Sequence, residues 1–274
     1  MKRALLVGIN YPGTPSQLNG CVNDVILMTS LLIQQFGFTD PMNRRILTDN
    51  SATTSEILRR LNWLVDGAQP GDSLYFHYSG HGSQMIDKDY DMEEEPDGKD
   101  EIICPSDLNW RDKVIKDDDL RNIFSRVPKG CDVTVTLDCC HSGQGLRTLV
   151  NPLEAPSPNK SRVLAMPADI EARGWGLNLP VKERKLQHVD TIEEQDGVLI
   201  SGCQSNQTSA DAWIHTKYHG ACTYYLWEVL KQSNFTISHT DLIQKMNQKM
   251  DKHGYTQNPE LNCASPFLNR NFLK

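Results

Sequence analysis

Two residues in this 274-residue chain, Cys140 and His81, have the side-chain types that catalysis by a thiol nucleophile requires. A free thiol has a pKa of about 8.5, so a nucleophilic cysteine needs a base within hydrogen-bond reach and donors for the oxyanion that forms. His81 lies between Gly80 and Gly82, where the backbone can approach a ligand closely. Each of the two residues follows a segment with the pattern of a buried strand. The pair therefore predicts a site at the ends of two strands.

Three neighbouring residues are alternatives for these roles. His77 lies inside the expected strand and is expected to pack, and His141 directly follows Cys140. Because adjacent residues at a strand end usually point apart, we favour His81 over both as the base. Cys139 is a rival nucleophile, and spacing alone does not choose between the two cysteines.

The apolar pattern of the chain alternates between strands and helices. Helical spacing is expected at 22–33, 120–127, 221–231, 239–252 and, after the capping-box pattern Thr53-x-x-Glu56, at 57–65. Short apolar runs predict strands at 4–9, 45–48, 73–78, 101–104, 131–137 and 197–203. An acidic loop follows Gly82, and a long irregular linker is expected from Gln144 to Asp196. This order indicates an α/β fold with a largely parallel central β-sheet, in which chemistry collects outside the carboxyl ends of the strands.

Composition excludes several classes of function. Hydrophobic residues make up 38% and charged residues 23% of the chain, its mean hydropathy is −0.49, and no apolar run could span a membrane. The N-terminal run is too short for a signal peptide. A net charge of −7 without a Lys/Arg cluster argues against nucleic-acid binding. The eight cysteines are dispersed, with no C-x-x-C pair, so we expect a cytoplasmic protein without disulfides.

The acidity is concentrated between Asp87 and Asp119, which hold fourteen acids and five bases. Calcium takes six to eight oxygen ligands, many from carboxylates, so this segment is a candidate calcium site. A solvated acidic loop is the alternative. Asp87-x-Asp89-x-Asp91 starts like an EF-hand loop, but Met92 and Gly98 stand where that loop needs Gly and Glu.

Six groups of residues in order along the chain resemble the motifs of metacaspases, which belong to the caspase-like clan. The histidine and cysteine motifs are Tyr78-Ser79-Gly80-His81-Gly82-Ser83-Gln84 and Asp138-Cys139-Cys140-His141-Ser142-Gly143. The others are Asn19-Gly20-Cys21-Val22-Asn23-Asp24, Asp97-Gly98-x-Asp100-Glu101 with Val114-Ile115-Lys116-Asp117-Asp118, Leu199-Ile200-Ser201-Gly202-Cys203-Gln204-Ser205 and Gln257-Asn258-Pro259-Glu260-Leu261.

The resemblance implies a single caspase-like domain with helices on both faces of the sheet. Residues 1–148 would be its large-subunit-like region, 149–196 its linker and 197–274 its small-subunit-like region. It also implies that Cys140 is the nucleophile of a cysteine endopeptidase and His81 its base. The backbone N–H groups of Gly82 and Cys140 would hold the oxyanion.

Metacaspases cleave after Arg or Lys, and the matching pocket positions are Asp24 and Asp138, with Ser79 as a polar neighbour. Two carboxylates can form charge-assisted hydrogen bonds with a guanidinium. For these two acids the alternatives are a helix N-terminal acid and a strand-end cap. The expected partners are therefore proteins or peptides with Arg or Lys before the cleaved bond.

The family's calcium site matches Asp100, Asp117 and Asp118, and its fourth acid falls on Arg147. An arginine there would remove a ligand and add a positive charge. We therefore expect calcium to activate the protein with lower affinity than a four-aspartate site would give.

Further expectations concern processing and assembly. The linker contains basic residues at which the chain could cleave itself, namely Arg147, Lys160, Arg162, Arg173, Lys182, Arg184 and Lys185. The first expected strand begins almost at Met1, so we expect no N-terminal prodomain, and by analogy with metacaspases we expect a monomer. A catalytically silent caspase-like module that binds calcium or partner proteins is the alternative function, as is a related hydrolase with another specificity.

Overall fold

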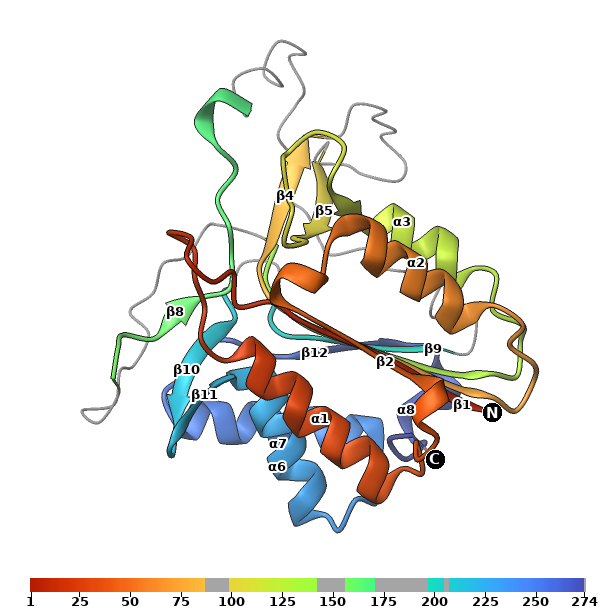
Figure 1. The fold of residues 1–274 in the computed structure, drawn as a ribbon. Coiled ribbons are helices and arrows are strands. Elements are labelled where there is room, and N and C mark those ends of the chain that lie inside the picture. The colour runs from red at the N-terminus through yellow and green to blue at the C-terminus, as the bar shows by residue number, and fades with distance from the viewer. Residues whose placement is uncertain (87–98, 142–155, 171–196, 205–206, 274) are drawn as a thin grey trace.

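The computed structural model describes residues 1–86, 99–141, 156–170, 197–204 and 207–273. Its centre is a six-stranded sheet with the order β12-β9-β7-β3-β1-β2 (Figure 1). The strands are β1 (Lys2–Gly8), β2 (Arg44–Thr48), β3 (Ser73–Ser79), β7 (Asp132–Asp138), β9 (Gly197–Ser201) and β12 (Glu260–Cys263). All neighbours pair in parallel except β12, which runs antiparallel to β9.

Helices cover both faces of this sheet (Figure 1). One face carries α1 (Cys21–Gln35), α6 (Ala221–Gln232) and α7 (His239–Lys252), and the other carries α2 (Thr54–Val65) and α3 (Asp117–Phe124). Successive strand residues point to opposite faces, so Leu5 and Val7 pack in the core under α2 and α3, whereas Ala4 and Leu6 pack in the core under α1, α6 and α7. Short helical turns complete the chain: η1 (Pro41–Asn43), η2 (Asp49–Ser51) and α8 (Ser265–Leu268).

Two small antiparallel sheets flank the carboxyl ends of the central strands. One has the order β4-β5-β6, formed by β4 (Gly82–Ile86), β5 (Lys99–Ile103) and β6 (Ile115–Lys116). The other has the order β11-β10-β8, formed by β8 (Lys160–Ser161), β10 (Ala210–Ile214) and β11 (Lys217–Gly220). These two sheets stand on either side of the edge where β3 and β7 end.

The expected α/β class, with a largely parallel sheet and helices on both faces, is confirmed. Thr53 is the N-cap residue of α2, as the capping-box pattern indicates. Its side chain accepts a hydrogen bond from the backbone N–H of Glu56. Strand β4 was not expected, because its sequence, Gly-Ser-Gln-Met-Ile, gives only a weak strand pattern beside the acidic loop. The described middle of the expected linker, 156–170, holds β8 and a fully buried Arg162, so this part is not irregular throughout.

Two further expectations bear on the environment of the protein. Within the described ranges, no helix combines the length and apolarity that a bilayer crossing needs. All eight cysteines are free thiols, and seven of them are buried. The EF-hand-like residues 87–98 lie outside the described residues.

His77, on β3, is a fully buried histidine whose ring stacks on Tyr75. Neither ring nitrogen has a hydrogen-bond partner among the residues that the structure describes. Burial lowers the pKa of His77 from 6.5 to about 4, because the charged ring would lose its hydration. His77 therefore packs as a neutral ring inside the sheet.

Acid should destabilise the fold through this residue. The unfolded chain protonates His77 below pH 6.5 while the folded chain resists until about pH 4, so stability falls as pH falls through that window. His77→Leu should remove about 2 kcal/mol of the stability loss between pH 7 and pH 5. Urea unfolding at the two pH values measures this, with exposed His253→Gln as the control. Equal losses in wild type and His77→Leu would contradict the prediction.

Candidate active site

His81 and Cys140 follow neighbouring parallel strands at equivalent positions. Ser79 at the end of β3 pairs in register with Asp138 at the end of β7, and each candidate residue lies two positions further on. The carboxyl ends of parallel strands meet at one edge of a sheet, so the register alone brings the two residues to the same edge.

Residues 160–166, named here the docked segment, cross this edge of the sheet. The carbonyl oxygen of Arg162 accepts hydrogen bonds from the backbone N–H groups of Gly82, at 3.0 Å, and Cys140, at 3.3 Å. The backbone of Arg162 also lies close enough to the His81 ring to favour its protonated form. The residues expected to form a dyad and an oxyanion site thus surround one peptide carbonyl of the chain itself. No hydrogen bond joins the Cys140 and His81 side chains, both of which lie in described ranges.

Gly82 must be glycine for this arrangement. A Cβ on Gly82 would overlap the carbonyl oxygen of Cys140. The close approach of the two backbones is what lets their N–H groups point at the same acceptor.

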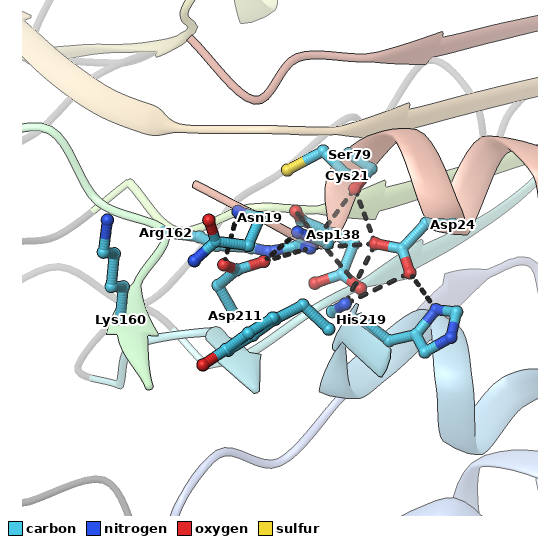
Figure 2. A network of polar contacts seen from close by, with 12 residues as sticks. Asn19, Cys21, Asp24, Ser79, Asp138, Lys160, Arg162, Asp211 and His219 are labelled. Carbon is cyan, nitrogen blue, oxygen red and sulfur yellow. Dashed lines mark hydrogen bonds and ion pairs between the residues drawn. The ribbon is translucent and has the colours of Figure 1, made fainter. Parts of the chain in front are cut away.

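The guanidinium of Arg162 is fully buried in a pocket of four polar side chains (Figure 2). Its Nη2 lies 2.8 Å from a carboxylate oxygen of Asp24 and 3.0 Å from one of Asp211. Its Nη1 lies 3.4 Å from the Asp138 carboxylate and donates to the hydroxyl of Ser79 at 2.8 Å. We call Asp24, Ser79, Asp138 and Asp211 the Arg162 pocket. The structure brings all three expected pocket residues together and adds Asp211.

The acids of the Arg162 pocket are held by donors other than the guanidinium. Asp138 accepts from the hydroxyl of Ser209 at 2.6 Å and from the hydroxyl and backbone N–H of Thr223 at 2.7 and 2.8 Å. Asp211 accepts from the backbone N–H groups of Asn19 and Gly20 at 2.8 and 2.9 Å. These bonds hold the two carboxylates in position around the guanidinium.

Asp24 shows the electrostatic balance of the pocket. Burial alone would raise its pKa, but the Arg162 guanidinium and hydrogen bonds from His219 and Ser79 lower it below the usual value. The backbone N–H of Gly220 donates to the same carboxylate at 3.0 Å. In turn, although burial favours the neutral form of Arg162, the surrounding carboxylates raise its pKa well above the usual value. Both partners are charged.

The candidate nucleophile and base are both neutral in this arrangement. Burial raises the pKa of Cys140, whose sulfur accepts a hydrogen bond from the backbone N–H of Ser209. Burial lowers the pKa of His81 to about 4, and its Nε2 lies 2.7 Å from the carbonyl oxygen of Ser16. Its ring also packs on Tyr11, with centroids 4.8 Å apart. A neutral imidazole can accept a proton, as a general base must.

The rival residues point elsewhere. Nδ1 of His141 lies 2.9 Å from the carboxylate of Glu101, and its Nε2 lies 3.7 Å from the sulfur of Cys139. Although burial opposes it, the nearby Glu101 raises the pKa of His141 well above the usual value. Cys139 and His141 thus face Glu101, on the β5 side of the chain, while Cys140 faces Ser209.

The expected calcium ligands are engaged with bases. Lys116 forms an ion pair with Asp100, and Nη1 of Arg121 lies 2.5 Å from the Asp118 carboxylate. Nη2 of Arg121 lies 3.8 Å from Asp117. Among the described residues, no group of three or more His, Cys, Asp or Glu is arranged to hold a metal ion. Arg147, at the fourth position, lies outside the described residues.

Sequence reasoning missed Asp211 and Gly220. Asp211 was detectable as the one acid in the otherwise apolar and aromatic run Ala-Asp-Ala-Trp-Ile of β10. Gly220 precedes α6, and nothing in the sequence shows that a Cβ there would overlap the Asp138 carboxylate and the Arg162 guanidinium. Arg162 was one of seven basic residues considered for self-cleavage, and only the fold singles it out. Of the other six, Arg147, Arg173, Lys182, Arg184 and Lys185 lie outside the described residues.

Known proteins with similar sequences identify the family. A sequence model of the "Metacaspase, peptidase C14 domain" matches residues 2–149. Metacaspase-1 of Schizosaccharomyces pombe is 34% identical over 294 residues, which cover 97% of this chain and 68% of the relative. Metacaspase-1B of Aspergillus fumigatus is 34% identical over 292 residues, which cover 97% of this chain and 70% of the relative.

The fold agrees with this assignment. A crystal structure of a protein from Geobacter sulfurreducens aligns with a TM-score of 0.68 and 25% identity, covering 100% of this chain and 98% of its own. With a family match over more than half of its length and relatives aligned along nearly all of it, this chain belongs to the metacaspase family and is a cysteine-type peptidase.

Proposed function

We propose that this peptidase cleaves peptide bonds after Arg, and less readily after Lys, with Cys140 as nucleophile and His81 as base. One observation carries the proposal. The side chain of Arg162 fills the acidic pocket while its carbonyl oxygen accepts from the N–H groups of Gly82 and Cys140. The chain's own Arg162 thus lies as the residue before a cleaved bond would lie.

The chemistry of the Arg162 pocket supports Arg over other residues. The planar guanidinium of Arg162 donates hydrogen bonds in several directions. Its nitrogens contact the carboxylates of three aspartates and the hydroxyl of Ser79. A lysine ammonium would reach the same depth with a single compact charge and fewer simultaneous partners. An aspartate would meet three like charges.

The reaction follows from the same positions. The Cys140 sulfur bonds to the carbonyl carbon of the arginine, and His81 takes the thiol proton. The N–H groups of Gly82 and Cys140 stabilise the oxyanion, because they already point at the carbonyl oxygen. His81 then gives its proton to the leaving amine as the peptide C–N bond breaks, and water hydrolyses the resulting thioester.

A consequence is self-cleavage between Arg162 and Val163. The Arg162 N–H donates to the Ser209 carbonyl at 2.9 Å, and Ser161 pairs with Ala210 across β8 and β10. The docked segment is therefore extended, which is the conformation in which proteases bind substrates. Among the candidate basic residues in the described ranges, Lys160 instead directs its ammonium to the carbonyl oxygen of Gln17.

We also propose that calcium stimulates this peptidase, with a low affinity. Asp100, Asp117 and Asp118 are balanced here by Lys116 and Arg121. Calcium would have to displace these two bases, which agrees with the low affinity expected from Arg147.

We also propose a cellular location, an oligomeric state and a class of partner for this peptidase. Eight free thiols suit the reducing cytoplasm. By analogy with metacaspases, we propose that the protein acts as a monomer. The partners would be proteins with an accessible extended arginine.

Self-cleavage is the first prediction. Wild type should separate into fragments 1–162 and 163–274, because Arg162 is the docked residue. Cys140→Ala and Arg162→Gln should remain whole at this bond, whereas the matched variant Lys160→Gln should still be cut. Gel analysis with intact mass and N-terminal sequencing identifies the bond. Cleavage confined to another basic residue would contradict the assignment of Arg162.

The second prediction concerns external peptides and calcium. Peptides with Arg before a fluorogenic group should be cleaved and those with Asp should not. Asp138→Asn should lower kcat/KM for Arg peptides about 100-fold or more, because it breaks a buried ion pair.

Calcium should raise the rate of Arg-peptide cleavage, and Asp118→Asn should shift this response to higher calcium concentrations.

Each arm of this experiment has its own contrary outcome. Unchanged activity after strong chelation would contradict calcium stimulation alone. Absence of Arg cleavage by folded wild type would instead favour the binding module.

The third prediction tests the pocket wall. Gly220→Ala places a Cβ against both the Asp138 carboxylate and the guanidinium position, so it should raise KM for Arg peptides at least about 10-fold. In the Cys140→Ala background, which stays uncut, Gly220→Ala should also expel Arg162, which faster hydrogen exchange at residues 160–164 would report. Unchanged KM and exchange in a stably folded variant would show that the pocket is not formed as described.

A further inference from the structure

The docked segment continues in contact with the protein beyond Arg162. The N–H of Leu164 donates to the carbonyl oxygen of Gly82 at 2.9 Å, and the hydroxyl of Ser83 donates to the carbonyl of Leu164 at 2.6 Å. Val163 forms a parallel bridge with Gly82. The chain after the proposed cleavage point is thus paired with the start of β4, as the chain before it is paired with β10.

Gly82 contacts both sides of the bond between Arg162 and Val163. Its N–H binds the Arg162 carbonyl and its carbonyl binds the Leu164 N–H. This parallel pairing sets the direction and the register of any segment that lies there. An extended chain in this register must present alternate side chains to the protein.

The side chains follow this alternation from Leu164 to Met166, and Val163 before them is also half-buried. Leu164 and Met166 are half-buried and pack against the core cluster beneath α2 and α3, whereas Ala165 between them is exposed. Pairing of an added strand combined with pockets for alternate side chains is a general mode of peptide recognition. The second and fourth positions beyond the cleaved bond therefore meet an apolar surface.

We propose that this surface beside β4 is a specificity site for substrates: the enzyme selects an extended arginine followed, two residues later, by a large apolar side chain. The proposal rests on the proposed function, since it takes the docked segment as a bound substrate. Ser83 is its positioning residue, because its hydroxyl holds the backbone carbonyl of that second position.

The test uses internally quenched peptides with the sequence of residues 159–168, Asn-Lys-Ser-Arg-Val-Leu-Ala-Met-Pro-Ala. Replacing the leucine by Asp should lower kcat/KM by about 10-fold or more, because a charge would meet the apolar surface. Replacing the adjacent alanine, which is exposed in the chain, by Asp is the matched control and should change it less than about 3-fold. Leu164→Asp in the full chain should slow self-cleavage, and Ala165→Asp should not.

A reporter that ends in Lys-Ser-Arg and a fluorogenic leaving group has no residues beyond the cleaved bond. It separates this inference from the proposed function. Ser83→Ala should lower the ratio of leucine-peptide to reporter cleavage about 5-fold, with the change in KM rather than kcat. Cleavage of the reporter with equal rates for the Leu and Asp peptides would overturn the specificity site alone. No cleavage of the reporter or the peptides would overturn both.

Discussion

The ion pairs between Arg162 and three buried aspartates are the interaction on which the rest of the site depends. Removing a charge from water costs several kcal/mol, and close partners must compensate it. The pocket holds three carboxylates, each fixed by backbone or hydroxyl donors that remain when the guanidinium leaves. A pocket emptied of Arg162 would therefore keep its carboxylates in position for another guanidinium. A site built in this way discriminates by charge first and by the planar shape of guanidinium second.

The same pocket joins parts of the chain that are distant in sequence. Asp24 comes from the first turn of α1, Ser79 and Asp138 from the ends of β3 and β7, and Asp211 from β10. The in-register pair Ser79 and Asp138 belongs to the central sheet. A slip of that register would separate Ser79 from Asp138 and, at the same time, His81 from Cys140. In the proposed function, cleavage chemistry and arginine selection therefore both depend on one structural feature, the register of β3 against β7.

How far the sequence predicted this site depended on whether the signal was local. Periodicity placed His81 and the Cys139-Cys140 pair at strand ends, whereas the choice of Cys140 and the assignment of Asp24 and Asp138 came from the match to metacaspase motifs. Asp211 and Gly220 act through contacts with residues at least 49 positions away, and no local pattern encodes such contacts. Strand β4 has little intrinsic preference and is defined by pairing with β5. Arg162 differs from the other linker bases only in where the folded chain puts it.

In the proposed function, the docked segment also determines the order of events at the site. Arg162 belongs to the same chain as the pocket, so its binding is intramolecular and is favoured over the binding of a separate substrate. An external arginine competes poorly while the tethered one is bound on both sides, by β10 before the bond and by β4 after it. Cutting between Arg162 and Val163 divides these contacts between two chain ends, each of which then dissociates with only part of the binding energy. Cleavage of the chain itself should therefore precede efficient cleavage of other proteins, and the cause is the tether rather than any change in the catalytic residues.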